Sequence, residues 1–242
     1  MSSLFKHNCN KNHIKDWLIE KFPSDYEDFT YIEPYCGAAI ILLHKTPSKN
    51  EIINDEDKGI VLILKVLRDQ SDQFIKHLKK VKYTKKIFET AYSTKEFSDE
   101  MSHAINEFVL RRLSKDGLKE SFSTCKSMNL NIKSLIEISD RLRDVYIFNE
   151  SPIKVLQIFN DCKTVVYANP PPLPESTEDT SYELILNNHI HLAEILKNFK
   201  GKVLLSGQPS RLNNKLYKGW RCDKKEVTLK NSTKVELLWM NF

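Results

Sequence analysis

The sequence predicts an α/β protein, in which a mostly parallel sheet is covered by helices and a helical segment is inserted into the chain. Two observations favour this class. Short apolar strands alternate with helix-length segments over residues 30–69, and the alternation resumes at residue 144. Between them, residues 70–140 are polar, have few strand signals, and carry apolar residues three or four positions apart, which is typical of helices.

Length and composition narrow the class of protein. The 242 residues, 40% of them apolar, are enough for one packed core with an inserted lobe. No run of 18 apolar residues occurs, so we expect no membrane span. The first residues lack an apolar signal region, and five cysteines lie far apart without a CxxC pair. We therefore expect an intracellular, cytoplasmic protein with reduced thiols and no metal site.

The first half of the chain contains the first strand–helix alternation. Pro23 ends a helix over 13–22, whose apolar residues have helical spacing. The elements expected after it are a strand from 30 that runs into a sharp turn by 38, a buried helix over 39–46, a strand over 51–55 and a helix over 55–69. In that last helix, Ile60, Leu64 and Leu67 are expected to face the core.

The second half contains the insert and the return of the sheet. Helices are expected in the insert over 74–81, 103–113 and 132–142. The elements expected after it are strands over 144–149 and 163–168, a helix over 188–199, a strand over 202–207 and a closing antiparallel pair at 226–230 and 234–242.

The segment EPYCGAA (33–39) follows a predicted strand and opens a predicted helix. A carboxylate at a strand end, followed by a glycine turn at a helix N-terminus, is typical of cofactor sites in α/β proteins. Asp55 ends the next strand, 18 residues after Gly37, where an acid can bond a ribose hydroxyl. The alternative for Asp55 is an ordinary helix N-cap.

The segment NPPP (169–172) follows the apolar strand TVVYA. It is a rigid turn that presents an amide oxygen and carbonyl groups, and its prolines donate no N–H. These acceptors suit an external amine, such as the amino group of a nucleobase. The alternative is an ordinary proline turn.

Positive charge is concentrated in two segments, although the net charge is only +5. Residues 76–86 carry six lysines and no acid, and residues 197–234 carry eleven Lys or Arg against two acids. Such segments favour a polyphosphate partner. The alternative is that these lysines form solvated faces.

Together these motifs resemble the Dam-like DNA adenine methyltransferases over nearly the whole chain. The resemblance rests on segments that follow one another in the family's order: LFKHNCNK, TYIEPYCGAA, EIINDEDKGIVLILKVLRD, FVLRRLSKDGLKESF, YANPPPLPEST and KVELLWMN. It implies a Rossmann-like S-adenosylmethionine-dependent sheet formed by 1–69 and 141–242, with 70–140 as a helical DNA-recognition lobe.

The resemblance also implies an activity and its partners. The protein would transfer a methyl group from S-adenosylmethionine to the exocyclic amine of adenine in double-stranded DNA, without a metal. Such DNA methylation belongs to restriction-modification or to the marking of nucleoid, phage or viral DNA. The residues do not indicate an oligomeric state or a recognition sequence.

The matching positions define the expected site. The cofactor would contact His7, Lys11, Glu33, Pro34, Tyr35, Gly37, Asp55, Glu150 and Asn169. The catalytic turn would be formed by Asn169, Pro170, Pro171 and Pro172. The DNA backbone would contact Lys79, Lys80, Lys82, Lys85, Arg111, Arg112 and Lys115.

Several positions depart from the family's pattern. Asn169 stands for an aspartate and Pro172 for the aromatic residue that stacks on the flipped base. The departures around the cofactor are His7 for a tryptophan, Cys9 and Asn10 for two glycines, and Ala39 for a loop glycine. Because they fall in the pockets, the alternative function is a catalytically inactive DNA-binding paralogue that keeps the methyltransferase fold.

Overall fold

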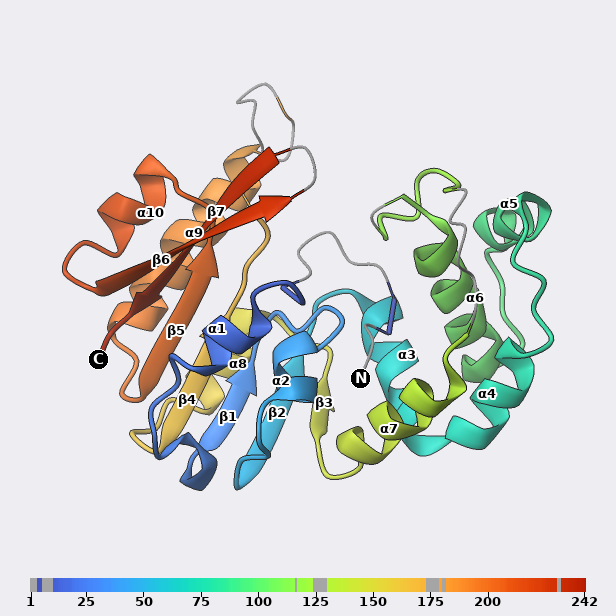
Figure 1. Cartoon of the computed structure of the whole chain (residues 1–242), viewed down its shortest axis with the longest axis horizontal. Helices are drawn as coiled ribbons and strands as arrows, with labels where there is room; N and C mark the ends of the chain where they lie inside the picture. Colours follow the sequence, from blue (N-terminus) through green and yellow to red (C-terminus); the bar gives the residue numbers. More distant parts are fainter. Residues whose placement is uncertain are drawn as a thin grey trace. The chain divides into compact units, whose positions relative to one another are not determined.

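The computed structural model describes residues 4–5, 11–115, 117–123, 130–172, 179, 182–229 and 232–242. In this part of the chain, a sheet of seven strands has the order β3-β2-β1-β4-β5-β7-β6 (Figure 1). The strands are β1 (Thr30–Glu33), β2 (Asn50–Asn54), β3 (Tyr146–Phe148), β4 (Thr164–Ala168), β5 (Lys202–Gly207), β6 (Arg221–Leu229) and β7 (Ser232–Met240). The predicted α/β class is confirmed.

The chain forms two compact units. The first contains residues 1–13, 37–45 and 55–149, and the second contains residues 14–36, 46–54 and 150–242. These boundaries differ from the division expected at 69 and 141. The physical reason is that the helix over 58–69 packs against helices of the insert rather than standing apart from them.

The second unit is organised around parallel strands. β1 pairs in parallel with β2 and β4, so that Ile32 lies opposite Ile52 on one side and Val166 on the other. β4 pairs in parallel with β5, and β7 then runs antiparallel between β5 and β6. The apolar residues Ile32, Ile52, Ile53, Val165 and Val166 of β1, β2 and β4 are buried, as is usual where both faces of a parallel sheet are covered. The predicted closing antiparallel pair is confirmed.

Helices and one 3₁₀ turn complete the second unit. They are α1 (Lys15–Ile19), η1 (Tyr26–Asp28), α8 (Pro152–Ile158), α9 (Tyr182–Lys197) and α10 (Arg211–Leu216). α8 begins with Pro152, whose fixed φ suits the first helical position, and it packs against α9. The sequence analysis did not predict α8 or α10, because both are short and lack a long apolar period.

The first unit is mostly helical (Figure 1). Its helices are α2 (Ile40–His44), α3 (Lys58–Asp69), α4 (Ser71–Leu78), α5 (Lys85–Ser93), α6 (Glu100–Leu113) and α7 (Ile132–Leu142). α3 packs against α4, α6 and α7. Its predicted inward residues Ile60, Leu64 and Leu67 are all buried, which confirms that face.

Capping residues set the starts of these helices. The Asp57 side chain accepts hydrogen bonds from the backbone at Gly59 and Ile60 and so begins α3. Asp99 and Ser102 form a capping box at the start of α6. An apolar cluster then joins α5 to α6, and its buried members are Phe88, Ala91, Val109, Leu110 and Leu113. Within 70–140, the described residues contribute no strand to the sheet.

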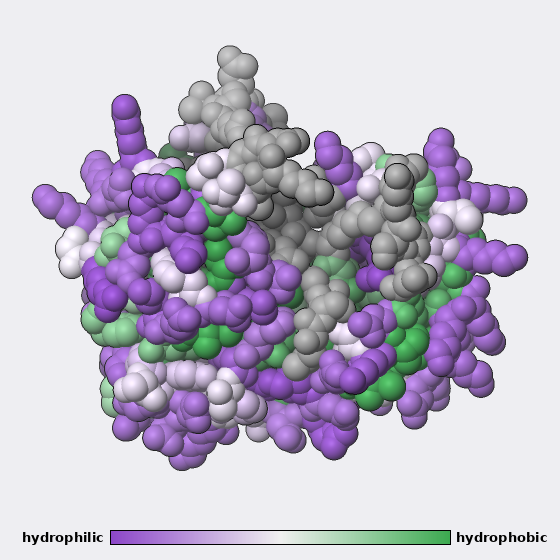
Figure 2. Space-filling view, viewed as in Figure 1, coloured by the Kyte–Doolittle hydropathy of each residue, from purple (hydrophilic) through white to green (hydrophobic). Residues whose placement is uncertain are grey.

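The surface is polar over most of the face shown in Figure 2, where apolar residues form separate patches. None of the described helices combines the length and the apolar character needed to cross a lipid bilayer. In the same part of the chain, no three His, Cys, Asp or Glu side chains are grouped in a way that could hold a metal ion.

Candidate active site

Asn54, the last residue of β2, joins the loop that follows β1 to Glu150, which precedes α8 in the second unit. Its side-chain Nδ2 donates to the carbonyl oxygens of Pro34 (3.1 Å) and Glu150 (2.9 Å), and its Oδ1 accepts from the Glu150 backbone N–H (2.9 Å). The Cys36 N–H donates to the Asn54 carbonyl at 2.9 Å. Asn54 is fully buried, and the sequence analysis missed it. The signal that could have found it is an amide at the end of an apolar strand.

Glu33 ends β1 and is almost completely buried. Its Oε1 accepts a hydrogen bond from the Tyr31 hydroxyl at 2.6 Å. Burial, followed by the nearby Glu33 charge, raises the pKa of Tyr31 well above its usual value, so that this hydroxyl stays a donor. The predicted cofactor residue Glu33 is therefore held rigidly at the strand end, and the half-buried Tyr35 follows it.

In the first unit, Asp55 fixes the glycine turn at residue 37. Its Oδ2 accepts from the Gly37 N–H at 2.8 Å, and its Oδ1 accepts from the Asp57 N–H at 3.0 Å. Gly37 has a φ of +51°, which glycine adopts without strain. Asn149 completes this arrangement, because its Nδ2 donates to the Asp55 carbonyl at 2.8 Å. Two predicted cofactor residues, Gly37 and Asp55, are thus joined directly.

Other predicted cofactor positions are only partly covered by the structure. Lys11 is buried in the first unit. His7 lies outside the described residues, as do the departures at Cys9 and Asn10. The Glu150 carboxylate pairs with Lys154 at 2.9 Å on the second unit's surface.

Ala39 occupies a backbone position that normally favours glycine. It precedes α2 with φ 51° and ψ 36°, in the left-handed region, and its methyl group is fully buried. A left-handed conformation costs a residue with a Cβ roughly 1–2 kcal/mol. The resemblance placed a glycine here, and the backbone explains why glycine would suit it.

We expect Ala39→Gly to leave the free energy of unfolding within about 0.5 kcal/mol of wild type, because relief of strain offsets the loss of about 0.8 kcal/mol of methyl burial. Ala38→Gly is the matched control, because Ala38 is equally buried but has no positive φ. It should lose about 1–2 kcal/mol. Urea unfolding measures both, and equal losses in the two variants would contradict the strain at Ala39.

The turn after β4 holds the predicted catalytic residues. The Asn169 Oδ1 accepts a hydrogen bond from the Ser206 hydroxyl of β5 at 3.0 Å, and this hydroxyl also bonds the Tyr167 hydroxyl at 2.9 Å. Two residues on, the carbonyl of Pro171 bonds the Nε2 of His189 at 2.8 Å. Pro171 and Pro172 are exposed. The sequence analysis did not single out Ser206, which lies inside an apolar strand.

Arg111 corrects the predicted DNA-binding set. Its side chain is only 3% exposed, and its Nη2 contacts Asp57 Oδ2 at 2.7 Å and Glu107 Oε2 at 3.2 Å. Lys119 contacts the same Glu107 oxygen at 3.1 Å. The expectation that Arg111 faces DNA phosphates is wrong, because its charge is neutralised inside the first unit. Burial acts to raise the pKa of Asp57, but the charge and hydrogen bond of Arg111, the Lys119 charge and the Ile60 N–H together outweigh burial, and the pKa is lowered.

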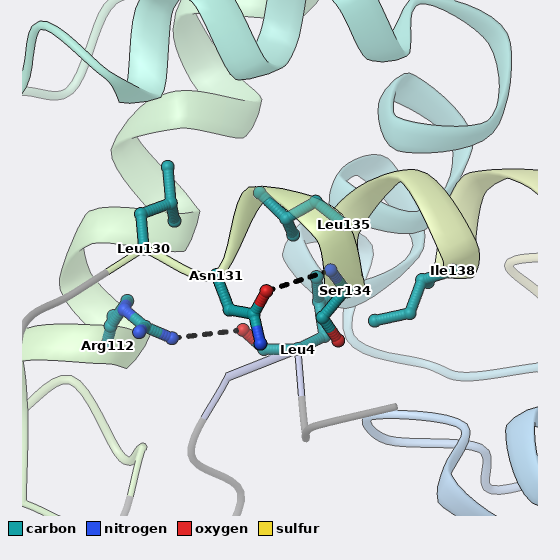
Figure 3. Close-up of a pocket in the computed structure, with 7 residues that line it drawn as sticks. All are labelled: Leu4, Arg112, Leu130, Asn131, Ser134, Leu135 and Ile138. Carbon is teal, nitrogen blue, oxygen red and sulfur yellow. Dashed lines mark hydrogen bonds between the residues drawn. The ribbon is translucent and has the colours of Figure 1, made fainter.

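Arg112 lies at a small pocket of about 20 Å³, which has room for one water molecule (Figure 3). Its Nη1 approaches the Leu4 carbonyl at 3.5 Å, and its guanidinium lies 5.9 Å from the Phe108 ring centre. The pocket is too small for a nucleotide. The remaining residues of the predicted DNA-binding set are exposed lysines: Lys79, Lys80, Lys82, Lys85 and Lys115.

One protein family matches the chain, and solved methyltransferase structures are similar to it at low identity. The family model of D12 class N6 adenine-specific DNA methyltransferases matches residues 9–234. The rRNA methyltransferase aviRa from Streptomyces viridochromogenes is 9% identical with a TM-score of 0.48, covering 100% of this chain and 90% of its own. The METTL16 methyltransferase domain is 9% identical with a TM-score of 0.42, and the match covers 96% of this chain and 67% of the METTL16 chain. No curated protein matches the chain.

Proposed function

Because the chain belongs to the D12 class N6 adenine-specific DNA methyltransferase family, we propose that it methylates the exocyclic amine of adenine in double-stranded DNA, with S-adenosylmethionine as the donor. The observation that carries this proposal is the turn after β4. There the amide oxygen of Asn169 is held by Ser206, and the residues that follow are prolines with carbonyl groups and no N–H.

The turn can hold an amine in a reactive orientation. The Asn169 Oδ1 is an amide oxygen, a type of atom that can accept two hydrogen bonds, and the Pro170 carbonyl is a further acceptor. Two acceptors that take both amine hydrogens direct the nitrogen lone pair away from the turn. This contribution is positioning, which can supply several kcal/mol of the barrier reduction. The adenine must first leave the duplex stack, a step that costs a few kcal/mol.

The residues at Gly37 and Asp55 fit a nucleoside cofactor. Each oxygen of the Asp55 carboxylate accepts one backbone N–H, and carboxylate oxygens are also acceptors of the kind that a ribose hydroxyl donates to. The positive φ of Gly37 turns the backbone sharply before α2. When bound, S-adenosylmethionine supplies an electrophilic methyl group. Within this proposal, Asp55 and Gly37 bind its nucleoside part, with Lys11, Glu33, Pro34, Tyr35 and Glu150 as the further expected contacts.

Phosphate contacts are proposed for the exposed lysines of the first unit. Each phosphate neutralised contributes close to −0.9 to the slope of log affinity against log salt. We expect reversal of Lys82 and Lys85 to glutamate to flatten this slope by about two units. Reversal of Lys133 and Lys154, two exposed lysines outside the predicted set, is the control with equal charge change. Equal slopes in both double variants would assign Lys82 and Lys85 to a solvated face.

Pro172 is the position where the chain lacks an aromatic face for the flipped base. Stacking of a base on an aromatic side chain contributes roughly 1–3 kcal/mol. We therefore expect Pro172→Tyr to raise methyl transfer by roughly tenfold to a hundredfold. Pro172→Leu, which adds apolar area without an aromatic ring, is the control. Transfer by wild type with no gain in Pro172→Tyr would show that another side chain supplies the stacking face.

A further inference from the structure

The turn of Asn169 and the three prolines accepts hydrogen bonds from side chains of other elements. Prolines have no N–H, so residues 170–172 cannot donate backbone hydrogen bonds to their surroundings. Hydrogen bonds can therefore fix residues 170–172 only through groups that accept. Two of the turn's acceptors, the Asn169 side chain and the Pro171 carbonyl, are bound by side chains from other elements, β5 and α9.

Ser206 fixes the orientation of the Asn169 amide. Its hydroxyl is buried and has one hydrogen, which is donated to Asn169 Oδ1 at 3.0 Å. The bond between Ser206 and Tyr167, at 2.9 Å, must therefore be donated by the Tyr167 hydroxyl. This chain of two donated bonds ends on the amide oxygen. It fixes the orientation of the Asn169 amide, so that its oxygen is the accepting side.

His189 fixes the backbone of the same turn. Its ring is buried on α9, and its Nε2 lies 2.8 Å from the Pro171 carbonyl oxygen. A carbonyl only accepts, so the hydrogen lies on Nε2. Burial lowers the pKa of His189, which favours the neutral ring and gives it one N–H to donate. His191, two residues along the helix, is exposed.

We propose that Ser206 and His189 are positioning residues, which together hold the Asn169 amide oxygen and the Pro170 carbonyl in register for the target amine. The inference rests on the proposed function. Ser206 sets one acceptor directly, and His189 sets the other indirectly, by fixing the carbonyl of Pro171, the residue that follows Pro170. Neither touches the reacting atoms. Their loss would therefore lower the rate of the bound complex and leave binding of DNA and cofactor in place.

The hydrogen bond of His189 can be tested without any activity. In the full chain labelled with ¹⁵N-histidine, long-range ¹H–¹⁵N spectra report which ring nitrogen carries the hydrogen. The His189 signals are assigned by their loss in His189→Gln. We expect the Nε2–H form, and a shift of the Pro171 carbonyl ¹³C signal in His189→Leu but not in His191→Leu. An Nδ1–H ring or an unmoved Pro171 signal would overturn the inference.

Kinetics test the positioning role. We expect His189→Leu and Ser206→Ala each to lower kcat by about tenfold or more, with KM for DNA and Kd for S-adenosylmethionine changed less than about twofold. His189→Gln and Ser206→Thr keep a donor and should restore most of kcat. His191→Leu is the matched control and should behave as wild type. Equal kcat in the leucine variants at 189 and 191 would overturn the positioning role.

Failure of the proposed methyl transfer and failure of the role of His189 give different results. In one outcome, wild type transfers no methyl group while its spectra show the Nε2–H ring and His189→Leu shifts the Pro171 signal. In that case the proposed function is wrong, and the hydrogen bond from His189 to the turn is confirmed. If wild type transfers methyl groups and the spectra show the other ring form, the function stands and the role of His189 is overturned.

Discussion

Arg111→Met is expected to lower the free energy of unfolding by about 3–5 kcal/mol, because it leaves two carboxylates without their shared cation. Arg111 is 3% exposed, and it lies between Asp57, which caps α3, and Glu107 on α6. Glu107 also lies so close to Gly59 of α3 that a Cβ there would overlap its carboxylate. Glu107 would keep only the partly exposed Lys119 as an ion partner, and it has little freedom to move toward water on the side of Gly59. Urea unfolding at neutral pH measures the loss.

Arg143→Met is the matched control, because it removes an arginine–aspartate pair of similar length that is exposed. Arg143 lies 2.6 Å from Asp140, and the two side chains are 74% and 59% exposed. Its loss should change the free energy of unfolding by less than about 1 kcal/mol.

The pH dependence of the free energy of unfolding is a second test of the Arg111 cluster. Because the pKa of Asp57 is lowered, its stabilisation is present above its usual pKa of 3.8 and is lost as pH falls below it.

The free energy of unfolding should therefore fall less steeply with decreasing pH in Arg111→Met than in wild type. The reason is that Asp57 then loses the partner that lowers its pKa. A variant that unfolds at the same urea concentration as Arg143→Met would contradict the stabilising role of the buried cluster. It would also make Arg111 a candidate again for contact with DNA phosphates.

Asp55→Ala is expected to weaken S-adenosylmethionine binding by about tenfold to a hundredfold or more. The variant loses a hydrogen bond to a ribose hydroxyl, which is worth about 1–3 kcal/mol when buried. It also frees the Gly37 N–H, which the carboxylate holds at 2.8 Å, and so loosens the turn before α2. Calorimetric titration measures the affinity, and thermal unfolding shows whether the variant is still folded.

Asp161→Ala is the control for Asp55→Ala, because Asp161 also accepts a backbone N–H, from Lys163 at 2.8 Å, on an exposed loop. Its affinity should equal that of wild type. Glu33→Ala should weaken binding as well, because the strand end it shares with Tyr31 would lose its buried hydrogen bond. Unchanged binding in both Asp55→Ala and Glu33→Ala would mean that the cofactor site lies elsewhere.

The parts of the fold that could be predicted are those where one local pattern decides the structure. The apolar strand TVVYA and the helix with Ile60, Leu64 and Leu67 are buried as their patterns indicate. Short helices such as α10 have no such pattern. The division into compact units depends on packing between α3 and the insert, which no local pattern shows.

For the candidate site, too, only the features with a local sequence pattern could be predicted. The turns at Gly37 and Asn169 could be located from strand ends, but their supporting side chains could not. Ser206 is a small polar residue within an apolar strand, and His189 lies on a predicted helix, 18 residues from the Pro171 carbonyl that it contacts. Arg111 was misassigned for a related reason: Asp57, its closest partner, is 54 residues away in the chain. The sequence shows where a charged residue stands, but folding decides which charges reach the surface.

The most direct test is transfer of a labelled methyl group to DNA, followed by digestion to nucleosides. The substrate is a pool of duplexes that together contain every short sequence, because the recognition sequence is not specified. We expect N6-methyladenine as the product with wild type and a loss of about a hundredfold or more with Asn169→Ala, which removes an acceptor of the amine. No product from wild type or from Pro172→Tyr at saturating cofactor would contradict the proposed enzyme, and DNA binding without transfer would favour the inactive paralogue.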